Sequence, residues 1–214
     1  MASVEEAALA LRNGATALGF VMRMPSGPGP IEQELAREII ATLPPSVPTF
    51  LLTCEHDADA IVAQLRGTGA NTVQLVDAVS PDTRQRIRRE LPDVRVVQVI
   101  HVTDEESIDE AREAAETSQM LLLDSGNPKA ATRELGGTGR VHDWRISRAI
   151  RDNVTVPLWL AGGLRASNVA DAVRVVGPYG VDVCSGVRTD GRLDPEKLRT
   201  FVAAARSNPA SVPA

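Results

Sequence analysis

Residues 158–187 read LWLAGGLRASNVADAVRVVGPYGVDVCSGV, and this stretch indicates how the chain folds. It begins with a short apolar run, Leu158–Ala161, passes through Gly162-Gly163 into an amphipathic segment, Ser167–Val175, and ends with a second run, Val181–Cys184. A strand, a helix and a second strand joined by short connections form the unit from which parallel sheets are built. The stretch therefore predicts a βαβ unit, and its apolar runs are typical of strands covered by helices.

The same alternation extends through the rest of the chain. Seven strands and eight helices, beginning with a helix, predict an α/β fold with a parallel sheet, either a closed barrel or a doubly wound layer. A closed (β/α)8 barrel would need a further strand before Val4, and three residues are too few to form it. The other expected strands are Ala17–Met22, Thr49–Thr53, Thr72–Val76, Val94–Val102 and Met120–Asp124. The other expected helices are Val4–Asn13, Ile31–Thr42, Asp57–Gly67, Pro81–Leu91, Asp104–Thr117, His142–Arg151 and Pro195–Arg206.

The length and composition favour one soluble domain over residues 1–206, followed by a flexible tail over 207–214. The chain has 214 residues, 43% hydrophobic and only 3% aromatic, so the core is expected to be aliphatic, as in parallel barrels. A net charge of −5 without a basic stripe argues against a nucleic-acid partner. No apolar run approaches the roughly 20 residues of a membrane span, and two unpaired cysteines fit a reducing cytoplasm.

Glycines follow several of the late strands, where parallel α/β proteins place their sites. Because glycine lets several backbone amides approach an anion closely, these segments predict a phosphate site. The alternative is that they are ordinary turns. The expected phosphate-binding residues are Gly137, Thr138, Gly139, Gly162, Gly163, Ser185 and Gly186.

Two carboxylates lie next to apolar strands, where a charge is costly unless it has a partner or a function. Asp124 ends the run Met120–Leu123, and it is interpreted either as a catalytic group or as a helix cap or loop anchor. Asp182 interrupts an apolar strand, so it is expected either to contact a ligand or to be satisfied by an arginine or a backbone amide.

Three further side chains at strand ends are weaker candidates. Cys54, His56 and His101 are expected more often as solvated loop residues than as catalysts, and Cys184 as a small buried side chain. Neither the histidines nor the cysteines have metal-ligand spacing, so we expect neither a metal nor a cofactor.

Several motifs together resemble the phosphoribosylanthranilate isomerase family. The strongest are Leu123-Asp124-Ser125, Gly136–Gly139 with Asp143-Trp144, Leu160–Leu164 with Asn168-Val169, and Pro178–Val187. Further matches are Gly14-Ala15-Thr16-Ala17-Leu18-Gly19-Phe20-Val21, Leu43-Pro44-Pro45-Ser46-Val47 and Val73-Gln74-Leu75.

The resemblance implies a barrel that lacks strand one and an Amadori rearrangement in tryptophan biosynthesis. An aminoaldose phosphate becomes a 1-amino-1-deoxyketose phosphate, which needs a general acid and a general base. By resemblance, Asp124 is the acid, the glycine segments hold the phosphate of a small phosphorylated sugar, and Arg23, Gln74 and Asp182 lie near the substrate.

Other positions depart from the family pattern. The family's base is a cysteine in a KICG segment that ends strand one, and no such segment is present in the sequence. A family histidine and glycine are replaced by Val76 and Asp77, a lysine by Gln98, and a basic loop by the Gly/Pro-rich residues Pro25–Pro30.

Three interpretations follow from these departures. In the first, the functional protein begins further upstream and includes strand one. In the second, it is a divergent enzyme on another phosphorylated sugar that uses Cys54, His56 or His101 as its base. In the third, it binds a phosphosugar without catalysis or pairs with another subunit. A true seven-stranded form is expected to form a homodimer that covers the open edge between the last strand and Ala17–Met22.

Overall fold

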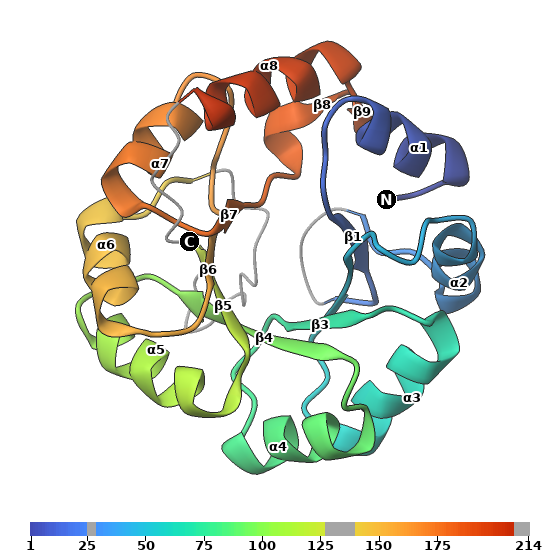
Figure 1. The fold of residues 1–214 in the computed structure, drawn as a ribbon, viewed down its shortest axis with the longest axis vertical. Helices are drawn as coiled ribbons and strands as arrows, with labels where there is room; N and C mark the ends of the chain where they lie inside the picture. Colours follow the sequence, from blue (N-terminus) through green and yellow to red (C-terminus); the bar gives the residue numbers. More distant parts are fainter. Residues whose placement is uncertain (25–28, 127–139, 208–214) are drawn as a thin grey trace.

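Helices surround a curled sheet in the computed structural model, which describes residues 1–24, 29–126 and 140–207 (Figure 1). The helices are α1 (Val4–Arg12), α2 (Gln33–Ala41), α3 (Ala58–Thr68), α4 (Pro81–Glu90), α5 (Glu106–Thr117), α6 (Trp144–Asn153), α7 (Val169–Val176) and α8 (Pro195–Arg206). The strands of the main sheet are β1 (Leu18–Val21), β2 (Thr49–Thr53), β3 (Thr72–Leu75), β4 (Arg95–His101), β5 (Met120–Asp124), β6 (Leu158–Leu160) and β7 (Gly180–Val181).

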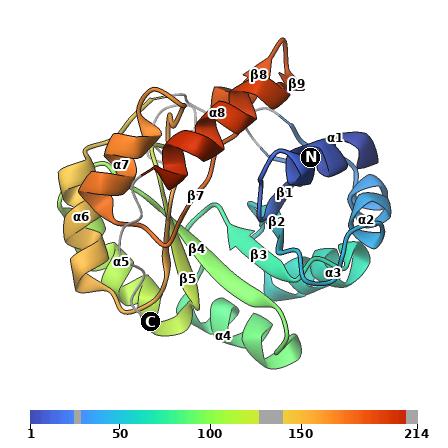
Figure 2. The same cartoon turned by 45° about the horizontal axis from the view of Figure 1, so that its top comes forward.

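The seven strands follow one another around the sheet in chain order, and every neighbouring pair is parallel. β1 and β7 are the outer strands, so within the described residues the sheet curls without closing, as the turned view shows (Figure 2). Each strand is followed by a helix on the outside of the curl. For the described residues, the prediction of a (β/α) barrel that lacks strand one, with seven parallel strands and eight main helices, is confirmed, and the alternative of a doubly wound layer is wrong.

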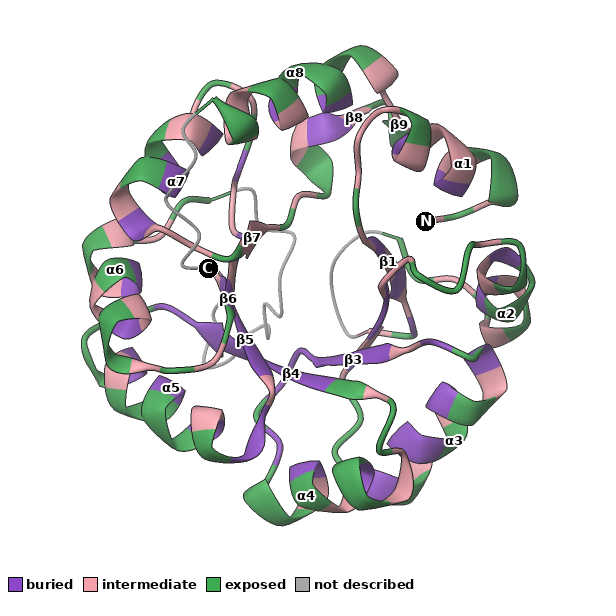
Figure 3. Cartoon of the chain, viewed as in Figure 1, coloured by how far each residue is buried: buried purple, intermediate pink, exposed green. Residues whose placement is uncertain are grey.

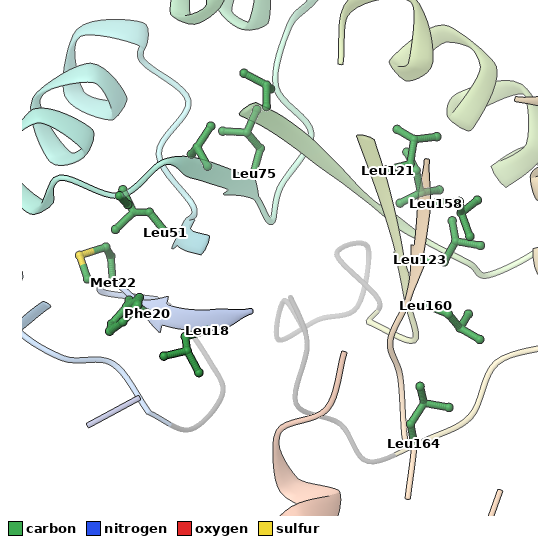
Figure 4. Close-up of a cluster of buried hydrophobic side chains, with 14 of the residues drawn as sticks. Leu18, Phe20, Met22, Leu51, Leu75, Leu121, Leu123, Leu158, Leu160 and Leu164 are labelled. Carbon is green, nitrogen blue, oxygen red and sulfur yellow. The ribbon is translucent and has the colours of Figure 1, made fainter. Parts of the chain in front are cut away.

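Two apolar clusters cover the two faces of the sheet. The larger joins strand and helix side chains, and it includes the fully buried Phe20, Leu51 and Leu121 between the sheet and the helices (Figure 4). The smaller consists of residues from the strands and their ends, including Phe50, Val97 and Leu122, and it fills the inside of the curl. Figure 3 shows the same pattern, because buried residues lie along the strands and on the inward helix faces. Burial on both faces explains the continuous apolar runs of the sequence.

Capping side chains set the beginnings of several helices. The side chains of Ser3, Asp57, Ser80, Asp143 and Asp194 each accept a hydrogen bond from a backbone N–H in the first turn that follows. Such bonds satisfy amides that the helix itself leaves unpaired. The expected and observed helix ends therefore agree to within two residues.

The segment after β7 differs from the prediction. The expected strand Val181–Cys184 is replaced by the two-residue β7, a 3-10 turn η1 (Ser185–Val187), and a hairpin of β8 (Arg188–Thr189) and β9 (Arg192–Leu193). Asp190 and Gly191 turn this hairpin with φ values of 49° and 76°. Asp-Gly is the residue pair that favours such a tight turn, so the hairpin had a readable sequence signal.

Two of the predicted segments include residues that the structure does not describe. Residues 25–28 of the Gly/Pro-rich loop and residues 208–214 of the expected tail are not described. Among the helices of the described ranges, none has the length and apolar character needed to span a bilayer.

Candidate active site

The inside of the curled sheet carries polar side chains at the carboxyl ends of its strands. Side chains alternate between the two faces along a strand. Since Val99 and Leu122 pack in the inner cluster, the next alternate residues, His101 and Asp124, also face the inside. His101 and Asp124 are also register partners on neighbouring strands, so their side chains lie side by side on this face.

Asp124 ends β5 in a position that favours its protonated form. Burial raises the pKa of its carboxyl group, and three smaller effects lower it: a hydrogen bond from the Ser125 amide, the nearby His101 ring and a hydrogen bond from the Ser125 side chain. The Ser125 amide donates to Oδ1 over 2.7 Å. Because burial is the largest effect, the carboxyl group keeps its proton to a higher pH than an exposed aspartate, as a general acid requires.

Asp182 follows β7, and its carboxyl group lies near that of Asp124. Its backbone N–H donates to Leu160 O over 2.8 Å, which fixes this residue beside β6. Desolvation of the carboxyl group by the surrounding protein raises the pKa of Asp182 to about 6, and the charge of Asp124 contributes in the same direction. The side chain nevertheless remains accessible to water, which screens part of both effects. Two carboxyl groups with raised pKa values therefore share the inside of the barrel mouth.

We expect Asp182→Asn to stabilise the fold in a pH-dependent way. A raised pKa means that the folded state binds the Asp182 proton more tightly than the unfolded chain does between about pH 4 and pH 6. The free energy of unfolding of the wild type therefore falls as the pH rises through this window. The variant avoids this loss, so its Tm should exceed the wild-type Tm by about 2–4 °C at pH 8 and by less at pH 4.

Calorimetry at the two pH values checks this result. Asp190→Asn, in the exposed β8–β9 turn, removes the same charge and should give no such pH-dependent gain. An equal gain from Asp182→Asn at both pH values would contradict the raised pKa as its cause.

The glycine segments after β6 and β7 touch each other. Gly162 and Gly163 have φ values of 86° and 61°, which favour glycine, and the Asn168 side chain donates to Gly163 O over 3.1 Å. A Cβ added to Gly186 would overlap the carbonyl oxygen of Leu164. The expected phosphate segments at Gly162-Gly163 and Ser185-Gly186 are therefore brought together, while Gly137, Thr138 and Gly139 lie outside the described residues.

The sequence interpretation missed His142, which lies beside this glycine turn. Its Nε2 lies 2.7 Å from Ser147 Oγ, and its Nδ1 would be 3.0 Å from a Cβ at Gly162. Burial lowers the pKa of His142 to about 4, so the ring is neutral at physiological pH. No local pattern marked this residue, because its neighbours come from tertiary packing.

The three weaker candidates, Cys54, His56 and His101, lie in different environments. Cys54 packs with the inner cluster, and its thiol donates to Arg23 O over 3.3 Å. His56 is largely exposed and lies 2.9 Å from Asp77, in the loops after β2 and β3. His101 is buried at the end of β4, so the expectation of a solvated loop residue is wrong for it.

The structure also changes one expectation, for Cys184, and shows what Gln98 does. Cys184 is exposed, not buried, because β7 ends early and the chain turns outward into η1. Gln98 belongs to the outer face: its amide nitrogen donates to Leu75 O and Asp77 O, and its Oε1 accepts from the buried Arg84. Gln98 therefore supports the loop after β3 and does not line the barrel interior.

The remaining substrate candidates lie near the barrel mouth. Gln74 is buried in β3 and alternates with Val76, which belongs to the inner cluster. Arg23 is exposed just after β1. In the described ranges, no group of three or more His, Cys, Asp or Glu side chains is placed to hold a metal ion.

Comparison with protein families identifies this arrangement. A family model described as N-(5'-phosphoribosyl)anthranilate (PRA) isomerase matches residues 1–204. The chain belongs to this family. Its members include the N-(5'-phosphoribosyl)anthranilate isomerase of Methanocella arvoryzae, which is 34% identical over 199 residues that cover 92% of this chain and 91% of the relative.

Solved structures of PRA isomerases share the fold. One, a complex with reduced 1-(o-carboxyphenylamino)-1-deoxyribulose 5-phosphate, has a TM-score of 0.80 and 28% identity, covering 96% of this chain and 95% of that one. Another, of monomers made from the dimeric Thermotoga maritima enzyme, has a TM-score of 0.79 and 26% identity with the same coverage. The recognition of the PRA isomerase family from sequence motifs is thus confirmed.

Proposed function

We propose that this chain is a PRA isomerase, which converts N-(5'-phosphoribosyl)anthranilate into its 1-amino-1-deoxyketose phosphate during tryptophan biosynthesis in the cytoplasm. The observation that carries the proposal is the pair of carboxyl groups, Asp124 and Asp182, inside the barrel mouth beside the two glycine segments. Their raised pKa values suit proton transfer near neutral pH. Family membership supports the same reaction.

In the proposed mechanism, Asp124 is the general acid. It gives its proton to the ring oxygen as the bond between that oxygen and C1 breaks, which opens the furanose and leaves a protonated imine. A base then removes the proton from C2, and the resulting enolamine tautomerises to the aminoketose. Burial around Asp124 keeps the proton available until the substrate binds.

The base and the phosphate contacts are further parts of the proposal. Cys54 and His101 face the inside and remain candidate bases, whereas His56 is engaged by Asp77 and is the weaker candidate. We assign the phosphate to the amides of Gly162, Gly163, Ser185 and Gly186, together with Gly137, Thr138 and Gly139. Arg23, Gln74 and Asp182 are the proposed contacts to the rest of the substrate.

Turnover of N-(5'-phosphoribosyl)anthranilate by the purified chain tests the proposal, because the reaction is followed by the loss of anthranilate fluorescence. Turnover would support the isomerase. No turnover, with inorganic phosphate still raising the Tm, would contradict it and favour a chain that binds a phosphosugar without this reaction.

We also propose a homodimer in which a second copy covers the open sheet edge. β1 and β7 are the outer strands, and an unpaired strand edge invites pairing with another chain. Light scattering should give a mass near twice 22.8 kDa. A single species at the monomer mass across micromolar concentrations would contradict the homodimer.

A further inference from the structure

Within the described residues, one ring nitrogen of His101 is hydrogen-bonded and the other has no hydrogen-bond partner. The residue is 7% exposed, and its Nε2 lies 2.9 Å from the carbonyl oxygen of Val76. Because a carbonyl oxygen only accepts hydrogen bonds, Nε2 must carry a hydrogen and donate it. In the neutral ring, Nδ1 is then a hydrogen-bond acceptor.

This Nδ1 is buried, and it has no hydrogen-bond partner in the part of the chain that the structure describes. Buried polar atoms in folded proteins are nearly always paired, so an unpaired one calls for an explanation. The ring lies on the inner face of the sheet, beside the carboxyl group of Asp124 on the next strand. The unpaired acceptor is thus located where the proposed acid meets its substrate.

The surroundings limit which group can bind there. An acceptor needs a donor, and neither a phosphate dianion nor the carboxylate of anthranilate can supply one. The hydroxyl groups of a sugar are neutral donors, and they belong to the part of the substrate on which Asp124 acts.

We propose that Nδ1 of His101 accepts a hydrogen bond from a hydroxyl group of the substrate's pentose, so that His101 is a specificity-determining residue for the sugar. The proposal rests on the function proposed above and extends it. The Val76 bond fixes the ring orientation and places the hydrogen on Nε2, which leaves Nδ1 as the acceptor.

A purely structural role for His101 can be separated from this one by His101→Gln. The amide nitrogen of glutamine can replace Nε2 as donor to Val76 O, but glutamine has no atom in the place of Nδ1. Asp57→Asn is the control, since it changes an exposed side chain at the same end of the barrel, where Asp57 caps α3.

Calorimetric titration with reduced 1-(o-carboxyphenylamino)-1-deoxyribulose 5-phosphate measures the effect. We expect His101→Gln to weaken binding about tenfold while leaving the affinity for inorganic phosphate unchanged. Asp57→Asn should bind both like the wild type. A set of analogues that each lack one pentose hydroxyl group tests the contact further. The analogue without the hydroxyl group that Nδ1 binds should have the same affinity for the wild type and for His101→Gln.

The outcomes are distinct. Equal binding of the full analogue by the wild type and His101→Gln would overturn the role of His101 but not the isomerase. A wild type that does not bind the analogue would overturn the proposed function and this inference with it. If His101→Gln does not fold, the ¹⁵N resonance of Nδ1 in the wild type decides: it should shift with the analogue and not with inorganic phosphate, and the absence of such a shift would reject the proposal.

Discussion

Asp124→Asn is expected to lower kcat about a thousandfold while leaving the fold intact, since general acids contribute about 10²–10⁴-fold. Asparagine has nearly the same shape, and its Oδ1 can still accept the hydrogen bond from the Ser125 amide. It cannot release a proton to the ring oxygen, so the furanose should open without general acid catalysis. Fluorescence-monitored turnover gives kcat, and the Tm shows whether the variant is folded.

Asp57→Asn is the control for Asp124→Asn. Asp57 caps α3 after β2, so its replacement removes a negative charge from the same end of the barrel, and asparagine is an equally good cap. This variant should keep its kcat within about twofold. If Asp124→Asn also kept the wild-type kcat, Asp124 would have no part in proton transfer, and another group would have to open the ring.

The sequence was most informative where a strand is paired on both sides. The expected bounds of Thr49–Thr53 and Met120–Asp124 agree with β2 and β5, because each strand lies between two others and both of its faces are buried. The last strand was predicted wrongly. β7 pairs on one side only, and at Gly180 a Cβ would lie 2.6 Å from the Trp159 ring, so local packing rather than an apolar run determines where this strand lies.

Some features of the site could likewise be predicted from the sequence, and others could not. Asp124 and Asp182 could be found because a charge beside an apolar run is a local signal. The burial of His101 could not be predicted, because its partner is the carbonyl group of Val76, which lies 25 residues away in the chain and directly after the neighbouring strand β3. His142 was missed for the same reason, since its closeness to Gly162 depends on how two loops pack. Long-range contacts of this kind leave no periodic trace in the sequence.

Gly186→Ala is expected to damage both the fold and the phosphate site. An added Cβ would overlap Leu164 O and lie 3.1 Å from Val183 Cγ2, so the turn after β7 would have to move away from the turn after β6. We expect the free energy of unfolding to fall by about 2–3 kcal/mol, as for other overpacked sites. The same movement separates the amides of the two glycine segments, so the affinity for inorganic phosphate should fall at least about tenfold.

A variant that loses stability without moving these turns separates the two effects. Gly177→Ala, at the far end of α7, also adds a methyl group to the βαβ unit, but no atom lies within 4 Å of it, and its cost comes from a φ of 67°. We expect it to lose about 1–2 kcal/mol of stability and to keep its phosphate affinity. Denaturant titration and the phosphate dependence of the Tm measure both quantities. If Gly186→Ala bound phosphate as tightly as Gly177→Ala, the contact between the two turns would not form the phosphate site, and the anion would have to be held by other amides.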